Sequence, residues 1–257
     1  MSVRPVALVT GAGRGIGRGI AAALAQHGYD VVVHDRDATC ATADAVAEVQ
    51  AAGARAAVVH ADIADLAAHG PLLDAAAASF GRLDCLVNNA GVSVLARGDL
   101  LDVTAESFDR CIAVNARGGF FLAQGFARML LRTEALPGRH RAIVFVTSSN
   151  AEAASLNRGE YCVSKAAAAM AARLFALRLA PAGIGVYDVR PGIIATEMTL
   201  RSKDRYDAMI AAGTVPMPRW GTVADVGQAV ATLATGALPY TVGLPVTVDG
   251  GLVTPHY

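Results

Sequence analysis

The chain has 257 residues, of which 54% are hydrophobic and 17% are charged, and its 22 basic and 22 acidic side chains cancel. This length and composition are typical of a folded globular protein with a substantial core, and they argue against intrinsic disorder. Zero net charge argues against nucleic acid or an anionic membrane as the main partner. No apolar run approaches the roughly 20 residues that a membrane span requires.

Two further features bear on location and metal content. The N-terminal residues pass directly into a strand-like run, without the separate apolar region and cleavage site of a secretory signal. The four cysteines lie far apart and form no metal-binding pattern, which is typical of buried, reduced thiols. We therefore expect a cytoplasmic protein that needs no metal ion.

Short, almost continuously apolar segments alternate with longer segments rich in alanine and leucine. The apolar segments predict seven strands buried on both faces of a parallel sheet, at 6–11, 30–35, 56–62, 83–91, 142–149, 185–192 and 245–251. The longer segments predict helices at 17–27, 38–52, 66–80, 104–131 and 161–180. This alternation predicts a doubly wound α/β fold, and the lack of a linker or repeat predicts one domain over residues 1–257.

The first predicted strand ends in a glycine-rich stretch, TGAGRGIG at 10–17, directly before the first predicted helix. Glycines there permit a tight turn and let the backbone approach a pyrophosphate, which the positive end of the helix attracts. The spacing is GxxxGxG, which differs from the usual GxGxxG fingerprint of dinucleotide-binding loops. The residues of this loop that we expect to contact a dinucleotide are Gly11, Arg14, Gly15, Ile16 and Gly17.

The second predicted strand ends at Asp35, 24 residues after Gly11. A carboxylate at this position can accept hydrogen bonds from the adenosine ribose of NAD, and it repels the 2′-phosphate of NADP. Arg36 and Arg14 could instead bind that phosphate, which leaves NADP open as the alternative. Asp35 occupies the strand end that faces the ribose, whereas Arg36 starts on the opposite face. We therefore favour NAD as the cofactor.

The stretch EYCVSKAA places Tyr161 and Lys165 one turn apart on one face of a predicted helix. Ser148 ends a predicted strand 13 residues before Tyr161, and neighbouring Ser149 is a weaker candidate for the same role. Free tyrosine ionises only near pH 10, so a tyrosine base needs a nearby positive charge, which Lys165 supplies. A serine hydroxyl can hydrogen-bond an oxygen on which negative charge develops. By itself, however, the Tyr-x-x-x-Lys spacing is common on solvated helix faces.

Taken together, the motifs resemble the short-chain dehydrogenase/reductase family. Five stretches occur in the family's order, with Ser148 before the fourth: TGAGRGIG, NNAG (88–91), VNARGG (114–119), YCVSK and RPGIIATEM (190–198). The similarity covers nearly the whole chain and is strongest to the branch of 3-oxoacyl-[acyl-carrier-protein] reductases and their relatives. It implies a Rossmann fold with a seven-stranded parallel sheet flanked by helices, and hydride transfer between a nicotinamide and a secondary alcohol or ketone.

The resemblance also implies a role for each matching residue. Tyr161 corresponds to the acid/base and Ser148 to the hydroxyl that polarises the carbonyl. Lys165 corresponds to the lysine that supports the tyrosine and holds the nicotinamide ribose, and Asn115 to the asparagine that positions a water in the proton relay. The resemblance implies further cofactor contacts for nine residues: Asp62, Ile63, Asn89, Ala90, Gly91, Pro191, Gly192, Ile194 and Thr196.

Substrate and assembly follow only from the family pattern. Residues 196–219 lie where the family has a variable, mobile substrate lid, and we expect a small alcohol, polyol, sugar or keto compound as the substrate. The alanine-rich faces of the predicted helices 104–131 and 161–180 resemble the dimer contacts of the family. The C-terminal strand matches an element that often makes a second contact, so the resemblance implies a homotetramer.

Two alternative functions stay open. The first is an NADPH-dependent 3-oxoacyl-[acyl-carrier-protein] reductase, with the arginines of segment 128–141 as a docking patch for an acidic carrier protein. These arginines also fit the end of a helix, whose partial negative charge favours basic residues. Such reductases often carry an arginine where this chain has Ala182. The second alternative is a non-catalytic, nucleotide-binding redox sensor, which the presence of Tyr161, Lys165 and Ser148 disfavours.

Overall fold

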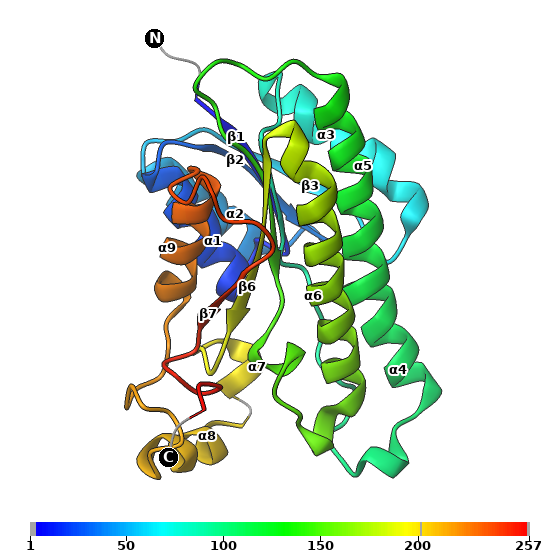
Figure 1. Ribbon diagram of the computed structural model, residues 1–257, viewed down its shortest axis with the longest axis vertical. Coiled ribbons are helices and arrows are strands. Elements are labelled where there is room, and N and C mark those ends of the chain that lie inside the picture. Colours follow the sequence, from blue (N-terminus) through cyan, green and yellow to red (C-terminus); the bar gives the residue numbers. More distant parts are fainter. Residues whose placement is uncertain (1–3, 201, 256–257) are drawn as a thin grey trace.

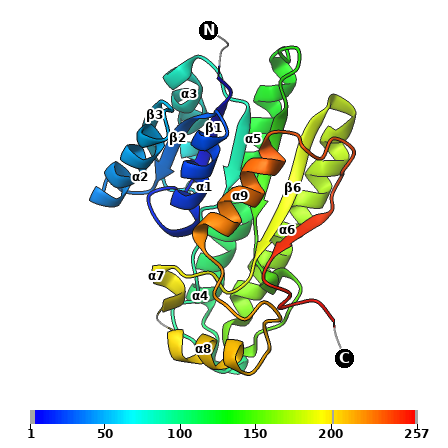
Figure 2. The ribbon, with the colours of Figure 1, turned by 90° about the vertical axis from the view of Figure 1, so that its left-hand side faces the viewer.

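The computed structural model describes residues 4–200 and 202–255. Seven parallel strands form one sheet in the order β3-β2-β1-β4-β5-β6-β7, with helices on both faces (Figures 1 and 2). This confirms the predicted α/β class and the number of strands. The strands are β1 (Val6–Thr10), β2 (Asp30–Asp35), β3 (Ala56–His60), β4 (Cys85–Asn88), β5 (Arg141–Val146), β6 (Ile184–Pro191) and β7 (Pro245–Val248).

Two groups of helices cover the two faces of the sheet. One face is covered by α1 (Gly15–Gln26), α2 (Cys40–Ala51) and α9 (Val223–Ala234). The other is covered by α3 (His69–Phe80), α5 (Gly119–Arg132) and α6 (Gly159–Leu179). Three shorter helices lie toward the end of the molecule that carries the strand carboxyl ends (Figure 1): α4 (Ala105–Cys111), α7 (Glu197–Leu200) and α8 (Lys203–Ala211).

Burial on both faces explains why the strands are apolar at nearly every position. In β1, Ala7 and Val9 pack with the α1, α2 and α9 side, whereas Val6 and Leu8 pack with the α3, α5 and α6 side. All four side chains are fully buried. A strand with one solvated face would alternate apolar and polar residues instead.

The predicted helix 104–131 is present as one uninterrupted helical segment over 105–132, but it is not α-helical throughout. It divides into α4, a π-helical turn over Ile112–Gly118, and α5. The backbone at Gly118 passes so close to Ile63 that an added Cβ would lie 2.5 Å from the Ile63 carbonyl oxygen. The apolar periodicity of the sequence does not indicate this widened turn, because the turn departs from the α-helical repeat over only one short segment.

Predicted strand ends extend a few residues too far, most clearly for 83–91, of which β4 keeps only Cys85–Asn88. The backbone N–H groups of Asn89 and Ala90 both donate to the Thr10 hydroxyl oxygen at 3.0 Å. They therefore leave the strand ladder and enter the loop that follows β4.

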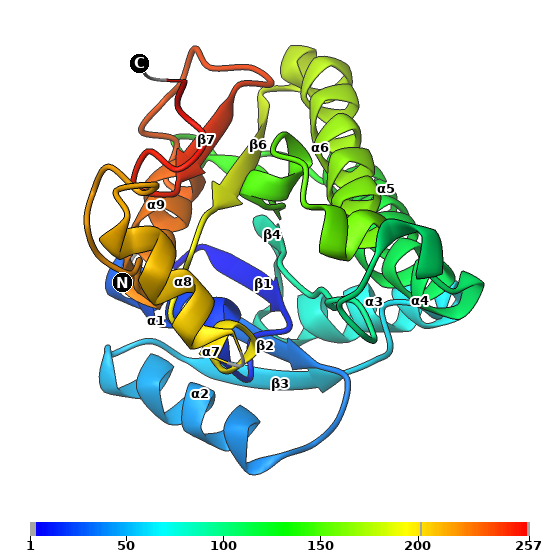
Figure 3. The same ribbon diagram turned by 90° about the horizontal axis from the view of Figure 1, so that it is seen from below.

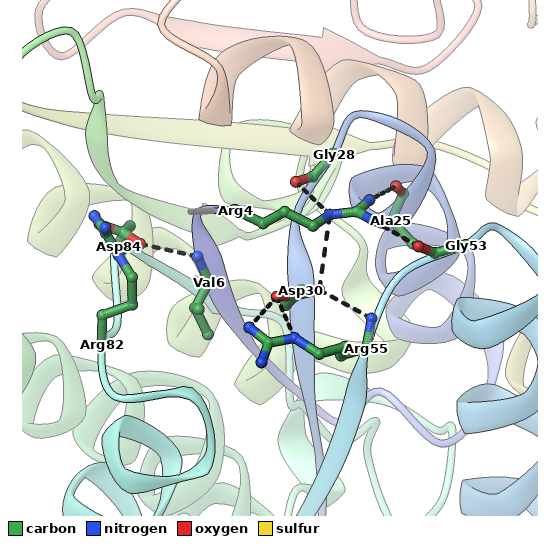
Figure 4. Close-up of polar contacts among 9 residues, drawn as sticks. All are labelled: Arg4, Val6, Ala25, Gly28, Asp30, Gly53, Arg55, Arg82 and Asp84. Atoms are coloured by element: carbon green, nitrogen blue, oxygen red, sulfur yellow. Dashed lines mark hydrogen bonds and ion pairs between the residues drawn. The ribbon is translucent and has the colours of Figure 1, made fainter. Parts of the chain in front are cut away.

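Charged side chains fasten the amino ends of the strands (Figure 4). Asp30 is fully buried, and its carboxylate accepts hydrogen bonds from the Arg55 side chain at 2.6 and 2.8 Å and from the Arg55 backbone N–H at 2.9 Å. Asp84 accepts the Val6 N–H at 2.9 Å and pairs with Arg82. A buried carboxylate is tolerated only with such partners. These residues support the end of the sheet opposite the glycine loop.

The expectation that the cysteines are buried, free thiols is correct for some of them. Cys85 and Cys111 are buried free thiols and Cys162 is half-buried, but Cys40 is exposed because it lies at the first, solvated turn of α2. In residues 4–200 and 202–255, no three or more His, Cys, Asp and Glu side chains gather as metal ligands would. Over the same residues, no helix is long and apolar enough to cross a membrane.

Candidate active site

The predicted site residues gather at the carboxyl ends of the strands, which Figure 3 shows from below. There β1 lies between β2 and β4, so the chain leaves β1 toward one side of the sheet and later returns to the other. In open α/β sheets, ligands bind at such a reversal of strand order. Helices α7 and α8 lie in front of the strand ends in this view.

The glycine loop has the conformation that its sequence predicts. Gly11 and Gly15 have φ values of +62° and +53°, a region that side-chain-bearing residues rarely adopt. At Gly17, an added Cβ would overlap the Gly11 carbonyl oxygen and lie 2.5 Å from the Asn89 amide nitrogen. Ile16 anchors the loop by packing against the core.

Thr10 joins the glycine loop to the loop after β4, a contact that sequence reasoning missed. Its hydroxyl donates to the Val87 carbonyl at 3.2 Å and accepts the Asn89 and Ala90 N–H groups. The Asn89 amide donates in return to the carbonyls of Thr10 and Gly11, at 2.8 and 3.2 Å. No local pattern indicates this network, because its members are far apart in sequence.

His34 supports the same loop from the adjacent strand. Its Nδ1 accepts the Gly11 N–H at 3.4 Å, and its Nε2 donates to the Ala61 carbonyl at 3.1 Å. This arrangement requires the neutral ring, and burial lowers the pKa of His34 to about 4. The side chain is only 1% exposed. His34 therefore links the glycine loop to the residues after β3 as an uncharged ring.

Asp35 and the two arginines near it have different surroundings. The Asp35 carboxylate accepts the Gly13 N–H at 3.2 Å and thus lies against the glycine loop. Arg36 is exposed and pairs with Asp37 at 2.9 Å. Arg14 is exposed and lies 3.5 Å from Glu197 of α7. Both arginine charges are therefore partly compensated by neighbouring carboxylates.

Two residues that we expect to contact the cofactor, Asp62 and Ile63, follow β3. Asp62 is exposed, and its carboxylate accepts the Ala64 N–H at 2.8 Å. Ile63 is buried against the π-helical turn at Gly118. Both residues follow β3, the strand next to β2, and lie at the carboxyl edge of the sheet.

Tyr161 and Lys165 lie in the first two turns of α6. The Lys165 side chain is buried and donates to the Val146 carbonyl, at the end of β5, at 3.1 Å. Its Nζ lies 5.8 Å from the centre of the Tyr161 ring. The Arg158 guanidinium carbon lies 5.4 Å from the same centre. The tyrosine ring therefore lies close to two positive charges, of which sequence reasoning found one.

Asn115 connects the π-helical turn to the loop after β4 and to α6. Its side chain accepts the Val92 N–H at 2.8 Å and donates to the Val92 carbonyl and the Ser164 hydroxyl, at 3.0 and 2.9 Å. A Cβ added to Gly91 would lie 3.2 Å from the Asn115 carbonyl oxygen and 3.4 Å from Lys165 Nζ. The structure thus brings Gly91, Asn115 and Lys165 together, as expected.

Ser148 lies two residues after the end of β5 and is buried. Its hydroxyl oxygen accepts the Asn150 N–H at 3.1 Å, so the hydroxyl proton can be donated to a substrate oxygen. Arg190 fixes this segment, since it donates to Asp188 on its own strand at 2.8 Å and to Glu152 at 2.9 Å. The sequence alone did not single out Arg190.

The loop after β6 has little free space. The Gly192 N–H donates to the Val248 carbonyl at 3.0 Å, and a Cβ there would lie 2.6 Å from the Asp249 side chain. Pro191 ends β6, and Ile194 forms a bridge with Gly221. The Thr196 methyl lies 3.6 Å from a Cβ position on Gly15, which brings this loop against the glycine loop.

A family model described as enoyl-(acyl carrier protein) reductase, of the short-chain dehydrogenase/reductase type, matches residues 11–253. The chain belongs to the short-chain dehydrogenase/reductase family. The resemblance inferred from its motifs is thereby confirmed. Its relatives in this family are named dehydrogenases and reductases, and the protein is an oxidoreductase.

Similar proteins cover this chain almost completely. The structure of a 3-oxoacyl-[acyl-carrier protein] reductase from Brucella melitensis in complex with NAD is 42% identical, covers 100% of both chains and has a TM-score of 0.95. The 2-dehydro-3-deoxy-D-gluconate 5-dehydrogenase of Dickeya dadantii is 31% identical over 96% of this chain and 94% of its own length. The 3-oxoacyl-[acyl-carrier-protein] reductase of Staphylococcus aureus is 32% identical, over 98% of this chain and 99% of its own length.

Replacement of His34 by glutamine is expected to flatten the pH dependence of stability. The unfolded chain takes up a proton on this histidine below about pH 6.5, whereas the folded protein does so only below about pH 4. The free energy of unfolding contributed by His34 therefore falls by about 3 kcal/mol as the pH drops between these values. Urea unfolding over this range measures the difference between wild type and variant.

The range well above pH 6.5 provides the reference for this experiment, because His34 is neutral there in both the folded and the unfolded state. In that range the difference in free energy of unfolding between wild type and His34→Gln should no longer change with pH. Identical profiles for wild type and His34→Gln would show that His34 titrates alike in the folded and unfolded states.

Proposed function

We propose that this family member is an NAD-dependent dehydrogenase that interconverts a secondary alcohol and the corresponding ketone, with Tyr161 as the acid/base. The observation that carries the proposal is the position of Tyr161 and Lys165 on one face of α6, where Lys165 and Asn115 border Gly91 beside the glycine loop. The groups for proton transfer and the candidate cofactor loop thus share one edge of the sheet.

Each side chain of the site has a separate role in the proposed reaction. When bound, the nicotinamide supplies a carbon that accepts or donates hydride. In the oxidative direction, the Tyr161 phenolate takes the proton of the substrate hydroxyl, and in the reductive direction the phenol returns it to the developing alkoxide. Ser148 donates a hydrogen bond to the same substrate oxygen. The positive charge of Lys165, 5.8 Å from the centre of the Tyr161 ring, would attract the negative charge that develops on the tyrosine oxygen during proton transfer.

Asn115 and Lys165 complete this proposed proton path. Asn115 is held by the Val92 backbone and by Ser164 of α6, so the π-helical turn is fixed relative to Lys165. We place Asn115 as the residue that positions a water between Lys165 and solvent. This water would replace the proton that Tyr161 exchanges with the substrate.

The proposed preference for NAD depends on the charges around Asp35. A carboxylate that lies against the glycine loop accepts ribose hydroxyls and repels a 2′-phosphate. Arg36 pairs with Asp37 and Arg14 lies beside Glu197, which weakens both as phosphate ligands. The Brucella relative was solved with NAD, whereas another solved family member holds NADP. We therefore favour NAD on the contacts of Asp35.

Small alcohols, sugars and hydroxy or keto acids are the substrates that we favour. The names of relatives include a 2-dehydro-3-deoxy-D-gluconate 5-dehydrogenase and an L-rhamnose 1-dehydrogenase. A carrier-bound acyl substrate has less support. Arg141, one of the arginines of the candidate docking patch, donates to the Leu130 and Thr133 carbonyls and thus satisfies backbone acceptors at the end of α5. Ala182 also lacks the charge that such reductases often have there.

We further propose a homotetramer in the cytoplasm. Helices α4, α5 and α6 expose large apolar side chains that a partner subunit would cover. They are Phe108, Phe121, Val163, Met170, Leu174 and Leu177. Around β7, Val242 and Leu244 are exposed as well, which fits a second contact of a tetramer.

Tyr161→Phe is expected to reduce turnover by about 10²–10⁴-fold, because general acid–base catalysis contributes on this scale. NADH binding, followed by fluorescence, should stay close to the wild-type value. The assay uses a secondary alcohol that the wild-type protein oxidises, found by screening sugars, polyols and hydroxy acids. Tyr240→Phe is the control, since Tyr240 is fully exposed. Unchanged turnover of Tyr161→Phe would refute the assignment.

Asp35→Asn is expected to narrow the preference for NADH over NADPH. In the wild type, NADH should bind at least about tenfold more tightly, because a close pair of like charges costs more than 1.4 kcal/mol. Fluorescence titrations at fixed ionic strength give both dissociation constants. Asp44→Asn removes the same charge from the nearby helix α2 and should leave the ratio unchanged. Tighter NADPH binding by the wild type would mean that Arg36 and Arg14 dominate.

The assembly is measured by sedimentation at micromolar concentration. We expect a species of four times the 26.3 kDa of one chain. Met170→Glu introduces a charge on the apolar face of α6 and should dissociate the tetramer. Met198→Glu is a matched control, since Met170 and Met198 are both 51% exposed but Met198 lies on α7. A wild-type monomer would contradict the proposal.

A further inference from the structure

Arg158 is a second cation beside the candidate acid/base. It lies at the N-terminal boundary of α6, three residues before Tyr161, while Lys165 lies four residues after it. Residues at this spacing form one stripe along a helix. The Arg158 guanidinium carbon is 5.4 Å from the centre of the Tyr161 ring, and Lys165 Nζ is 5.8 Å from it.

The two cations differ in what they contact. Lys165 is buried and donates to the Val146 carbonyl, on the side of the site where β5 ends. Arg158 is half-buried, and its Nε is inaccessible to solvent and lacks a hydrogen-bond partner within the described part of the chain. A buried donor without an acceptor is unfavourable and uncommon in folded proteins. A ligand cannot reach this enclosed Nε, but the half-buried side chain leaves other guanidinium N–H groups from which it can receive hydrogen bonds.

The charge of Arg158 also lacks compensation. Three other arginines around the site have acidic partners: Arg14 has Glu197, Arg36 has Asp37, and Arg190 has Asp188 and Glu152. Arg158 forms no such ion pair with the residues that the structure describes. A negative charge on a ligand near Tyr161 would thus be attracted to Arg158.

Arg97 adds a second positive charge at the same end of the site. Its Nη2 donates to the Tyr206 hydroxyl on α8 at 3.2 Å, and its Nη1 donates at 3.5 Å to Asn157, the neighbour of Arg158 in sequence. Arg97 therefore connects the loop after β4 and the segment before α6 to helix α8, which lies in front of the strand ends in Figure 3. Arg158 directly follows Asn157, so Arg97 and Arg158 both contribute positive charge at this end of α6.

We propose that the substrate carries a carboxylate close to its reacting carbon and that Arg158 binds this carboxylate, which makes an α- or β-hydroxy acid, or the corresponding keto acid, the substrate class. This inference rests on the proposed dehydrogenase function. A guanidinium holds carboxylate oxygens at about 2.7–2.9 Å, and a tyrosine exchanges protons over about 2.6–3.2 Å. With Arg158 next to the Tyr161 ring, one small molecule can span both groups.

The first test compares a charged substrate with its neutral counterpart. β-Hydroxybutyrate and its methyl ester carry the same secondary alcohol and differ in the negative charge. In Arg158→Gln, kcat/KM should fall roughly 10–150-fold for the acid, as expected for a lost charge-assisted hydrogen bond, and stay within about threefold for the ester. Arg173→Gln, at an exposed position further along α6, is the matched control and should affect neither.

Equal losses for acid and ester would overturn the inference, because Arg158 would then act only on Tyr161 and not on the substrate. Wild-type preference for the ester over the acid would overturn it as well. In both cases the proposed dehydrogenase function would stand, since the alcohol is still oxidised. The NADH affinity of Arg158→Gln, measured in parallel, shows that the variant is folded.

A second measurement tests the carboxylate site without any turnover. Butyrate and the neutral butyramide are titrated into the complex of protein and NADH at constant ionic strength, with NADH fluorescence as the signal. We expect butyrate to bind at least tenfold more tightly than butyramide, and this preference to be lost in Arg158→Gln and kept in Arg173→Gln. No preference in the wild type would overturn the inference. A preference without turnover of any alcohol would instead refute the dehydrogenase proposal alone.

Discussion

Helices cover both faces of the central parallel sheet, and this burial restricts where polar side chains can lie. The strand interiors accept almost only apolar residues, so charged and hydrogen-bonding groups collect at the two ends of the sheet. At the amino ends, the carboxylates of Asp30 and Asp84 receive arginine and backbone donors and hold neighbouring strands together. The carboxyl ends are therefore the place where a nucleotide and a substrate can meet polar groups.

The loops at these carboxyl ends are positioned by contacts between segments far apart in sequence. Thr10 and Asn89 exchange hydrogen bonds between the loops after β1 and β4, and His34 holds the glycine loop as a neutral ring. The π-helical turn directs Asn115 toward Val92 and Ser164. π-Helical turns are frequent at functional sites because they redirect a side chain without ending the helix. Here the turn places an asparagine beside Lys165.

Charge compensation divides the site into two regions. Beside the glycine loop, Arg14 and Arg36 face carboxylates, so the Asp35 carboxylate is the charge in contact with that loop. Beside the Tyr161 ring, Arg158 has no ion-pair partner among the described residues. The two places differ because only some of the arginines have an acidic neighbour. The net charge of zero, which sums over the whole chain, does not reveal this difference.

Much of the protein could be predicted from the sequence because the signals are local. Continuous apolar runs indicate buried strands, glycines at 11, 15 and 17 indicate a close backbone turn, and the spacing of Tyr161 and Lys165 places them on one helix face. The order of these motifs also sufficed to recognise the family. Only the tertiary structure decided the π-helical segment within the helix 104–131, the Thr10 and His34 contacts, the pairing of Arg14 with Glu197, and the position of Arg158 beside Tyr161. These features depend on side-chain orientation and on packing between distant segments, which leave no periodic pattern along the chain.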